Sequence, residues 1–285
     1  MNIPPPMRAL ITGATDGVGR LVAERLAAAG TGVIVHGRNH DKGRGVVEEI
    51  QREIGNSKVE FQRGDFESLD EVRRLAREIT DAHDRIDLLV NNAGIGFGRP
   101  EASREISRDG YESRFAVNYL APFLLTHLLL PVIRRSAPAR IVNVASIGQA
   151  PIDFDDVMLT RRYDGRRAYA QSKLALVMFT LDLAAALQDT RVTVNAVHPA
   201  TFMNTKMVSE AGFGPQSTVE EGADAILHLA TSPDLEGVSG RFFDGMRESR
   251  ALEAAYDPAG RRKLRQLTLE LVGLSGEEAL GRMPA

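Results

Sequence analysis

The feature that most constrains this chain is its alternation of short apolar strands with amphipathic helical segments. The segments at residues 86–91 and 140–145 are nearly continuous apolar runs, which are typical of parallel strands buried on both faces. Strands that alternate with helices predict βαβ units, and the right-handed crossover rule leaves few ways to arrange them. We therefore expect an α/β fold, a doubly wound (Rossmann) parallel sheet of about seven strands with helices on both faces.

The same pattern predicts where the elements lie. Strands are expected at about residues 8–12, 32–36, 59–62, 86–91, 140–145, 191–197 and 241–243. Helices are expected at about residues 18–29, 42–54, 69–82, 103–130, 168–188 and 219–231, with two more at 247–256 and 261–272. Because no linker divides the chain, we predict one domain over 1–285, with an α/β core at 7–245 and a C-terminal helical appendage at 246–285.

Charge and cysteine content exclude several classes of protein. The 35 Lys and Arg residues against 38 Asp and Glu give a net charge of −3, so we expect no nucleic-acid partner and no membrane partner. The chain has no cysteine, which excludes disulfide scaffolds, thiolate metal sites and cysteine nucleophiles, and we expect no metal. The longest apolar run, near residues 120–133, is shorter than the roughly 20 residues of a membrane span. Residues 1–6 do not resemble a signal peptide, which favours a cytoplasmic location.

A glycine-rich loop follows the first expected strand and precedes the first helix. Its glycines are Gly13, Gly17 and Gly19. Glycine lets the backbone turn sharply and approach a pyrophosphate, and the helix N-terminus behind it offers free N–H groups. We therefore predict a dinucleotide-phosphate site that also includes Thr15, Asp16 and Val18. The alternative is a glycine-rich turn that binds no ligand.

The residue type after the second strand bears on the choice of cofactor. An acidic residue there usually holds the ribose 2′-hydroxyl of NAD, and this chain has none at residues 36–39. Arg38 is placed to pair with a 2′-phosphate, and Arg20 is a second candidate, so we predict NADP(H) with NAD(H) as the alternative. The other interpretation is that both arginines are solvated surface residues.

Two later segments complete the predicted cofactor site. Asp65 and Phe66 follow the third strand, where an aspartate can hold the adenine amino group; a helix N-terminal turn is an equally good interpretation of the pair. Asn92, Ala93 and Gly94 close the fourth strand, where small residues let a cofactor lie against the backbone.

The predicted reaction centre combines a tyrosine and a lysine one helical turn apart. Tyr169 and Lys173 share a helix face, and a lysine ammonium together with a cationic nicotinamide would lower the tyrosine pKa from about 10 toward neutrality. Such a tyrosine can give a proton to a carbonyl or take one from an alcohol. Ser146 ends the fifth strand, where it could bind the substrate oxygen, and Asn118 is an amide in an apolar stretch that needs partners. Taken singly, these residues could also be a surface pair, a turn serine and a core asparagine.

Together these residues resemble the short-chain dehydrogenase/reductase family over about residues 7–245. The resemblance rests on motifs in the family's order: the glycine loop, Asp65, residues 91–94, Ser146, and Tyr169 with Lys173. It implies hydride transfer at a nicotinamide, with Tyr169 as the acid/base and Ser146 orienting the carbonyl. It further implies that Lys173 holds the nicotinamide ribose and that Asn118 supports a water in a proton relay. The family often pairs through its fourth and fifth helices, so a homodimer or homotetramer is implied.

Two departures from the family pattern refine this resemblance. Ala200 replaces the glycine that usually follows Pro199. Thr201 is expected to contact the cofactor there, with Asn204 and Thr205 as further candidates because the register is open. The segment between Ser146 and Tyr169 is longer than usual, which resembles the branch of retinol dehydrogenases and related carbonyl reductases. Since this chain shows no membrane anchor, retinoid substrates are not implied.

The loops around the predicted centre suggest the kind of substrate. An apolar pocket is predicted from Phe97, Ile152, Phe154, Met203 and Phe213, with ordinary loop packing as the alternative. We expect a small-molecule partner, a medium-sized and largely apolar ketone, aldehyde or secondary alcohol. An arginine cluster at residues 161–167 could attract an anion, but the acidic residues beside it favour a self-paired loop. A cofactor-sensing regulator without turnover is the alternative to an enzyme, and a nucleotide-sugar dehydratase or epimerase is the rival enzyme.

Overall fold

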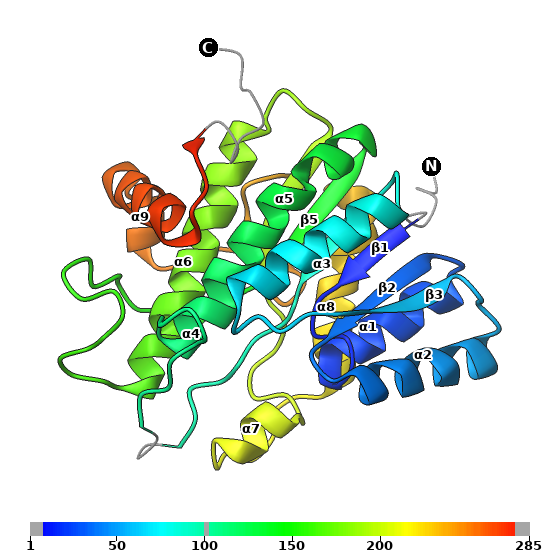
Figure 1. Cartoon of the computed structure of the whole chain (residues 1–285), viewed down its shortest axis with the longest axis horizontal. Helices are drawn as coiled ribbons and strands as arrows, with labels where there is room; N and C mark the ends of the chain where they lie inside the picture. Colours follow the sequence, from blue (N-terminus) through cyan, green and yellow to red (C-terminus); the bar gives the residue numbers. More distant parts are fainter. Residues whose placement is uncertain (1–7, 100–102, 277–285) are drawn as a thin grey trace.

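Strands and helices alternate along the computed structural model, which describes residues 8–99 and 103–276 (Figure 1). The strands are β1 (Arg8–Ile11), β2 (Gly32–Gly37), β3 (Val59–Arg63), β4 (Leu88–Asn91), β5 (Ala139–Val144), β6 (Val192–His198), β7 (Phe242–Asp244) and β8 (Arg247–Ser249). The helices are α1 (Gly17–Ala28), α2 (His40–Ile54), α3 (Leu69–Ala82), α4 (Ser113–Phe115), α5 (Ala121–Arg135), α6 (Gly165–Ala186), α7 (Lys206–Glu210), α8 (Val219–Thr231) and α9 (Pro258–Val272). A π-helical turn, η1 (Ala116–Leu120), joins α4 to α5, and short 3-10 turns lie at Pro233–Leu235 and Glu253–Tyr256.

One sheet of eight strands, in the order β3-β2-β1-β4-β5-β6-β7-β8, forms the centre of the structure. The first seven pair in parallel, and β8 pairs antiparallel with β7. The chain order reverses between β1 and β4, so the crevice at their carboxyl ends is where such sheets bind ligands. The predicted doubly wound parallel sheet is confirmed, with one antiparallel strand added.

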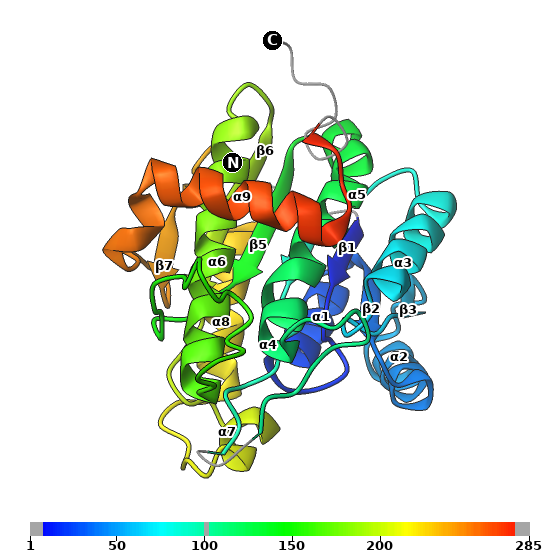
Figure 2. The same cartoon turned by 60° about the vertical axis from the view of Figure 1, so that its left-hand side comes forward.

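Each face of the sheet is covered by its own apolar layer. Helices α1, α2 and α8 pack on one face through residues such as Val22 and Ile226. Helices α3, α5 and α6 pack on the other through residues such as Leu75 and Leu174, and α9 lies across that layer (Figure 2). Strands buried on both faces explain the continuous apolar runs in the sequence.

The long helix expected at residues 103–130 begins ten residues later than predicted. Residues 106 and 112 form an antiparallel bridge, and the Glu112 carboxylate accepts the Phe115 N–H at 2.7 Å, which starts the helix at Ser113. The helical stretch Ser113–Arg135 has 23 residues, and an 18-residue window within it has a mean hydropathy of 1.7, values that a membrane span would also show. Because 89% of that window is buried inside the protein, it serves here as a core helix.

The C-terminal segment differs from the prediction at residues 247–256. That stretch was expected to be helical, but Gly245, at φ +59°, turns the chain back so that residues 247–249 pair with β7. Helix α9 is then fixed to the core by ion pairs from Arg261 and Arg265 to Asp182 of α6, each at 3.0 Å. The described part of the appendage, up to residue 276, is therefore part strand and part helix, and it is docked on the second layer.

Candidate active site

The carboxyl ends of the parallel strands bring the predicted site residues to one edge of the sheet. The glycine loop follows β1, Arg38 follows β2 and Asp65 follows β3. Residues 92–94 follow β4, and Ser146 follows β5. Segments far apart in the sequence are thus neighbours because the strands that carry them pair in parallel.

The phosphate loop (Thr12–Gly19) is shaped by close backbone contacts. Gly13 has φ +65°, and a Cβ on it would lie 2.8 Å from the Ala93 Cα. Gly17 has φ +52°, and the Asp16 carboxylate caps α1 through the Gly17 N–H at 2.8 Å. Behind the loop, the first-turn amides of α1 have no intrahelical partner. This narrow backbone cradle at a helix N-terminus fits a dinucleotide pyrophosphate.

The structure separates the two arginines proposed for a 2′-phosphate. The Arg20 guanidinium is already paired with Glu24 and Glu49, each at 2.7 Å. Arg38 is exposed, and its side chain has no ion pair with any residue that the structure describes. Lys42 was not predicted from the sequence as a site residue. Its ammonium contacts the Asp16 carboxylate of the phosphate loop at 2.5 Å. Arg38 is therefore the better placed of the two arginines for an anionic ligand.

The loop between β3 and α3 (residues 64–68, the β3–α3 loop) presents Asp65 but not the Phe66 ring. One Asp65 carboxylate oxygen accepts the Glu67 N–H, and the other pairs with Arg108 at 2.9 Å. Phe66 is 5% exposed and its ring faces the protein interior. The predicted cofactor contact of Phe66 can therefore involve its backbone, while its ring belongs to the core.

The predicted catalytic side chains come together at the carboxyl end of β5. The Ser146 side chain interacts with the Tyr169 hydroxyl and favours its phenolate form. A Cβ on Gly148 would lie 3.3 Å from the Ser146 Oγ and 3.9 Å from the Tyr169 ring, which confirms how close the two residues are. The Lys173 Nζ lies 5.7 Å from the Tyr169 ring centre and donates to the Val144 carbonyl at 2.8 Å.

Asn118 connects this centre to the loop after β4 through both the oxygen and the nitrogen of its side-chain amide. Its Oδ1 accepts the Ile95 N–H at 2.8 Å, and its Nδ2 donates to the Ile95 carbonyl at 3.1 Å and to the Ser172 Oγ at 3.0 Å. The Ser172 hydroxyl donates in turn to the Tyr169 carbonyl at 2.7 Å. The buried asparagine thus holds the loop after β4 against the turn of α6 that carries Tyr169.

Burial governs the ionisation of the pair on α6. It raises the pKa of Tyr169, and the interaction with Ser146 only partly offsets this. It also lowers the pKa of the Lys173 ammonium to about 8. The sequence predicted that Lys173 and a bound cationic nicotinamide together lower the Tyr169 pKa toward neutrality; in the chain alone burial has the larger effect, and the Lys173 ammonium donates to a backbone carbonyl. Tyr169 is therefore a protonated phenol at neutral pH.

An aromatic rim stands beside Tyr169. The Phe97 ring packs edge-on against the Tyr169 ring at 5.8 Å and against Phe213 at 5.7 Å, and Phe213 stacks on Phe202 at 4.9 Å. The guanidinium of Arg166 lies over both Phe97 and Phe213, at 5.8 and 5.7 Å. We call Phe97, Phe202 and Phe213 the aromatic rim; Phe202 and Arg166 were not among the residues predicted to line the pocket.

The other three residues of the predicted apolar pocket pack elsewhere. Phe154 lies under the Lys263 ammonium of α9 at 4.7 Å, and Ile152 packs against the second apolar layer. Met203 packs against Gly222 of α8. The sequence pattern could not separate these residues from Phe97 and Phe213, because all five are apolar side chains in loops.

The long segment before Tyr169 is anchored by polar contacts. The Tyr163 hydroxyl donates to the buried Glu112 carboxylate at 3.1 Å and accepts from Arg114 at 2.7 Å. Within the segment, Arg161 pairs with Asp156 and Arg167 with Asp153, which confirms the predicted self-paired loop.

The segment after β6 separates the two threonines, Thr201 and Thr205, that were candidates for a cofactor contact. Thr201, the predicted cofactor contact, is hydrogen-bonded to His198 at 3.1 Å. A Cβ on Gly17 would lie 3.4 Å from the Thr205 side chain, so Thr205 is the threonine that lies against the phosphate loop. The sequence left this register open because Ala200 interrupts the usual motif.

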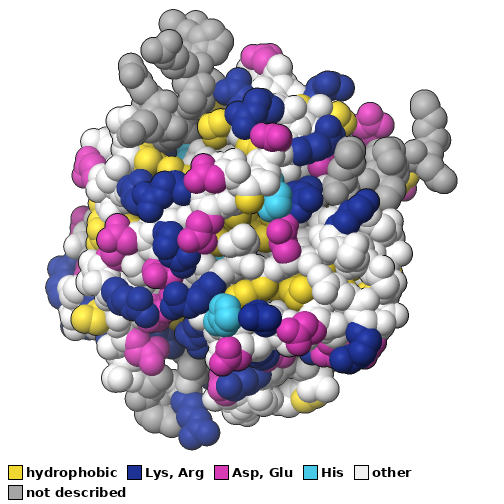
Figure 3. Space-filling model, turned by 45° about the vertical axis from the view of Figure 1, so that its right-hand side comes forward, with side chains coloured by type: hydrophobic (Ala, Val, Ile, Leu, Met, Phe, Trp, Pro, Cys, Tyr) yellow, Lys and Arg dark blue, Asp and Glu magenta, His cyan; other side chains and the backbone are white. Residues whose placement is uncertain are grey.

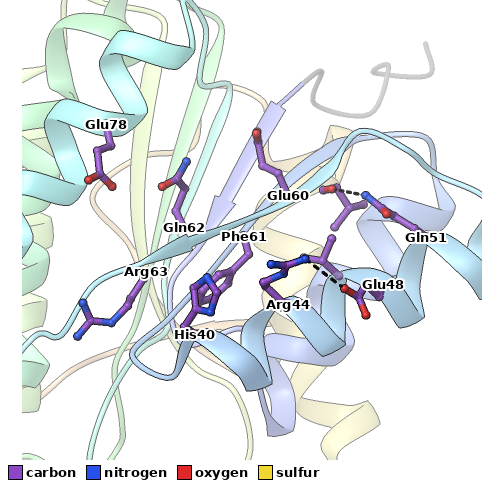
Figure 4. A pocket seen from close by; sticks show the side chains of 11 residues that line it. His40, Arg44, Glu48, Gln51, Glu60, Phe61, Gln62, Arg63 and Glu78 are labelled. Carbon is purple, nitrogen blue, oxygen red and sulfur yellow. Dashed lines mark hydrogen bonds and ion pairs between the residues drawn. The ribbon is translucent and has the colours of Figure 1, made fainter.

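A groove of about 550 Å³ lies along the edge strand β3, away from these residues (Figure 4). Its lining is mixed in charge and includes His40, Arg44, Glu48 and Glu60, and none of the predicted site residues lines it. On this side of the molecule basic and acidic side chains are interspersed and do not gather by sign (Figure 3). Within residues 8–99 and 103–276, no group of three His, Asp or Glu side chains could hold a metal ion.

Comparison with known proteins assigns the family. The description "short chain dehydrogenase" matches residues 7–213. Retinol dehydrogenase 13 of Mus musculus is 37% identical over 288 residues, which cover 95% of this chain and 85% of that protein. A crystal structure of an uncharacterized protein from Mycobacterium paratuberculosis superposes with a TM-score of 0.77 at 28% identity and covers 94% of both chains. A structure from Escherichia coli CFT073 complexed with NADPH has a TM-score of 0.69 at 29% identity and covers 84% of this chain and 96% of that one.

The chain therefore belongs to the short chain dehydrogenase family, in its retinol dehydrogenase-like branch. Membership makes it an oxidoreductase by class, in agreement with the resemblance read from the sequence.

Proposed function

We propose that this chain is an NADP(H)-dependent oxidoreductase that acts on the carbonyl or secondary alcohol of a medium-sized, largely apolar substrate. The observation that carries the proposal is the placement of Tyr169, which lies beside Ser146 and one helical turn from Lys173. When bound, the nicotinamide would supply or accept the hydride. The chain itself supplies the proton and fixes the reacting oxygen.

The proton chemistry follows from the geometry around Tyr169. In the reducing direction Tyr169 donates its phenolic proton to the substrate oxygen, and in the oxidising direction it takes that proton back. Ser146 binds the same oxygen and orients it, since its side chain lies beside Tyr169 at the carboxyl end of β5. Lys173 would hold the nicotinamide ribose and favour the phenolate by its charge. Asn118 positions the turn that carries Tyr169 and is proposed to support a water in the proton relay.

The preference for NADP(H) rests on charge at the end of β2. Arg38 is exposed and unpaired in the described part of the chain, and no acidic residue is present there to hold a 2′-hydroxyl. The structure from Escherichia coli CFT073, which is complexed with NADPH, supports the same choice. NAD(H) is the alternative cofactor.

The aromatic rim supports an apolar substrate. Phe97 and Phe213 offer ring surface directly beside Tyr169, where an apolar body would displace water from both. The name of the relative, retinol dehydrogenase, is also that of an enzyme with an apolar alcohol substrate. We propose carbonyl reduction as the reaction to test first, because Tyr169 is protonated at neutral pH.

The test is NADPH consumption across a panel of ketones and aldehydes, with NADH in parallel. We expect turnover with NADPH on aromatic and medium-chain carbonyls. Turnover with NADH alone would overturn the role of Arg38, and activity only on small charged acids would overturn the apolar substrate. NADPH binding without turnover of any carbonyl would overturn the enzyme proposal in favour of a cofactor sensor.

We also propose the homodimer or homotetramer that the resemblance predicts, with an interface that includes α9. The helices through which the family often pairs correspond to α5 and α6 here, and α9 is ion-paired to α6. A mass of two or four chains in light scattering would agree, and a mass of one chain would contradict it. The cytoplasmic location stays a prediction.

A further inference from the structure

One buried histidine has no part in the chemistry above, yet it lies between the two loops assigned to the cofactor's adenosine half. His36 is on β2, one residue before the strand ends, and is 3% exposed. Its neighbours are the phosphate loop on one side and the β3–α3 loop on the other. Nothing in the sequence pattern assigns it a role.

The imidazole is hydrogen-bonded to both loops. The Gly13 N–H donates to the Nδ1 at 3.3 Å, so the proton is on the Nε2, which donates to the Gly64 carbonyl at 3.1 Å. The ring also stacks on Phe66, with centres 4.5 Å apart and planes at 24°. Burial lowers the pKa of His36 to about 4, so the neutral ring that this arrangement needs is the form present at neutral pH.

The fit around the ring is close. A Cβ on Gly64 would lie 3.1 Å from the Nε2, and Gly13 is confined on its other side by Ala93. The His36 carbonyl adds a third link, since it accepts the Ala14 N–H at 2.9 Å. A change in the ring therefore bears directly on the backbone of both loops, since the ring is hydrogen-bonded to each of them.

We propose that His36 is a positioning residue that ties the phosphate loop to the β3–α3 loop and so sets the affinity for the adenosine diphosphate half of the cofactor. The proposal rests on the dinucleotide site of the proposed function but not on turnover or on the 2′-phosphate. His36 touches neither reacting atom, so it acts on binding and leaves the proton transfer at Tyr169 unaltered.

Three substitutions separate the two hydrogen bonds. His36→Ala removes both, His36→Asn keeps an acceptor where the Nδ1 faces Gly13, and His36→Gln keeps a donor that can reach Gly64. The matched control is His127→Ala. His127 is also buried and packed on an aromatic ring, tilted at 41° with its centre 4.2 Å from that of Phe123. Its Nδ1 lies 2.8 Å from the Phe123 carbonyl, and burial lowers its pKa to about 4. It packs among core residues of α5 and contacts neither cofactor loop.

The measurement is the Kd for NADPH, for 2′,5′-ADP and for 5′-ADP, together with the Tm of each variant. We expect His36→Ala to raise all three Kd values about tenfold, and His36→Asn and His36→Gln, which each keep one of the two hydrogen bonds, to raise them about threefold. His127→Ala should lower the Tm by a similar amount and leave each Kd within about twofold.

The proposal would be overturned if His36→Ala and His127→Ala, at equal loss of Tm, changed the Kd values equally. The change in Kd would then reflect only the lower stability of each variant. Binding of NADPH by the wild type without turnover would overturn the proposed enzyme and leave this inference intact. Binding of 5′-ADP but not of its 2′-phosphate form would overturn only the preference for NADP(H), and the 5′-ADP series would still test His36. If the wild type bound none of the three ligands, both proposals would be wrong.

Discussion

The reaction side of the candidate site and its nucleotide side are built from different kinds of contact. On the reaction side, Ser146, Lys173 and Asn118 are buried and each hydrogen-bonded to the protein. On the nucleotide side, Arg38 stands exposed on a surface loop. Buried groups feel a low dielectric and cannot exchange a lost partner for water, whereas exposed charges are screened. Substitutions on the reaction side should therefore have the larger effects.

The largest effect is expected from Tyr169→Phe, which removes only the proton donor. We expect kcat to fall about 1,000-fold, the usual scale for loss of a general acid, while the Kd for NADPH changes little. Tyr163→Phe is the matched control, because its hydroxyl contacts Glu112 and Arg114 and no reacting group. Comparable loss of kcat in both variants would remove the distinction between Tyr169 and a structural tyrosine.

A second effect on the reaction side concerns stability and pH. The folded protein lowers the Lys173 pKa from 10.5 to about 8, so between these values the unfolded chain binds the proton and the folded chain does not. The free energy of unfolding should therefore rise with pH across this window, by about 3 kcal/mol from this one group. The measurement is urea denaturation at pH 8 and at pH 10.5. Lys173→Met should show no such rise in unfolding free energy between the two pH values, and it should also lose activity.

Lys58→Met, at an exposed position, is the control for that experiment and should keep the wild-type pH dependence. If Lys173→Met also kept the rise in unfolding free energy with pH, burial of the Lys173 ammonium would not cause that rise. The reaction side would then be less desolvated than its contacts indicate.

A smaller effect is expected on the nucleotide side. Arg38→Ala should raise the KM for NADPH about tenfold and leave the KM for NADH unchanged, as for one charged contact with a 2′-phosphate. Arg20→Ala is the control. The Arg20 guanidinium already pairs with Glu24 and Glu49, so this substitution should not alter the ratio of the KM values for NADPH and NADH. If Arg20→Ala changed that ratio more than Arg38→Ala does, Arg20 would be the residue that contacts the 2′-phosphate.

The smallest effect is expected at the aromatic rim. Phe213→Ala removes one ring from the pair with Phe97, so the KM for an aromatic ketone should rise about fivefold while that for acetone stays constant. Phe154→Ala changes an aromatic residue that lies under Lys263 instead and should leave both KM values alone. Equal effects of the two substitutions would mean that the rim does not contact the substrate.

Local patterns were enough to predict most of this site. The glycine loop, Ser146 and the Tyr169–Lys173 pair follow from spacing within one strand end or one helix turn, and parallel pairing brings such positions to one edge. Helix start signals were less reliable at residues 103–112, where the Glu112 cap sets the true beginning of the helix. The strand at residues 247–249 was missed because it depends on a turn at Gly245 and on an available edge of β7.

What the sequence could not predict depends on partners that are distant along the chain. Arg20 and Arg38 look equivalent until Glu49 is found beside the first. The Phe66 ring turns inward because His36 offers it a stacking surface from another strand. The Tyr169 pKa was predicted from its nearest charge, whereas burial by the surrounding residues has the larger effect. Each of these outcomes is decided by tertiary packing and desolvation, which have no local pattern.

The central claim is that a hydride passes from NADPH to a substrate carbonyl with Tyr169 as proton donor. Its most direct test is the reduction of an aromatic ketone with NADPH deuterated at the nicotinamide C4, followed by mass analysis of the alcohol. The account predicts one deuterium on the carbinol carbon with the wild-type protein and almost no labelled alcohol with Tyr169→Phe. Alcohol that forms without deuterium, or label that appears equally fast with Tyr169→Phe, would contradict it.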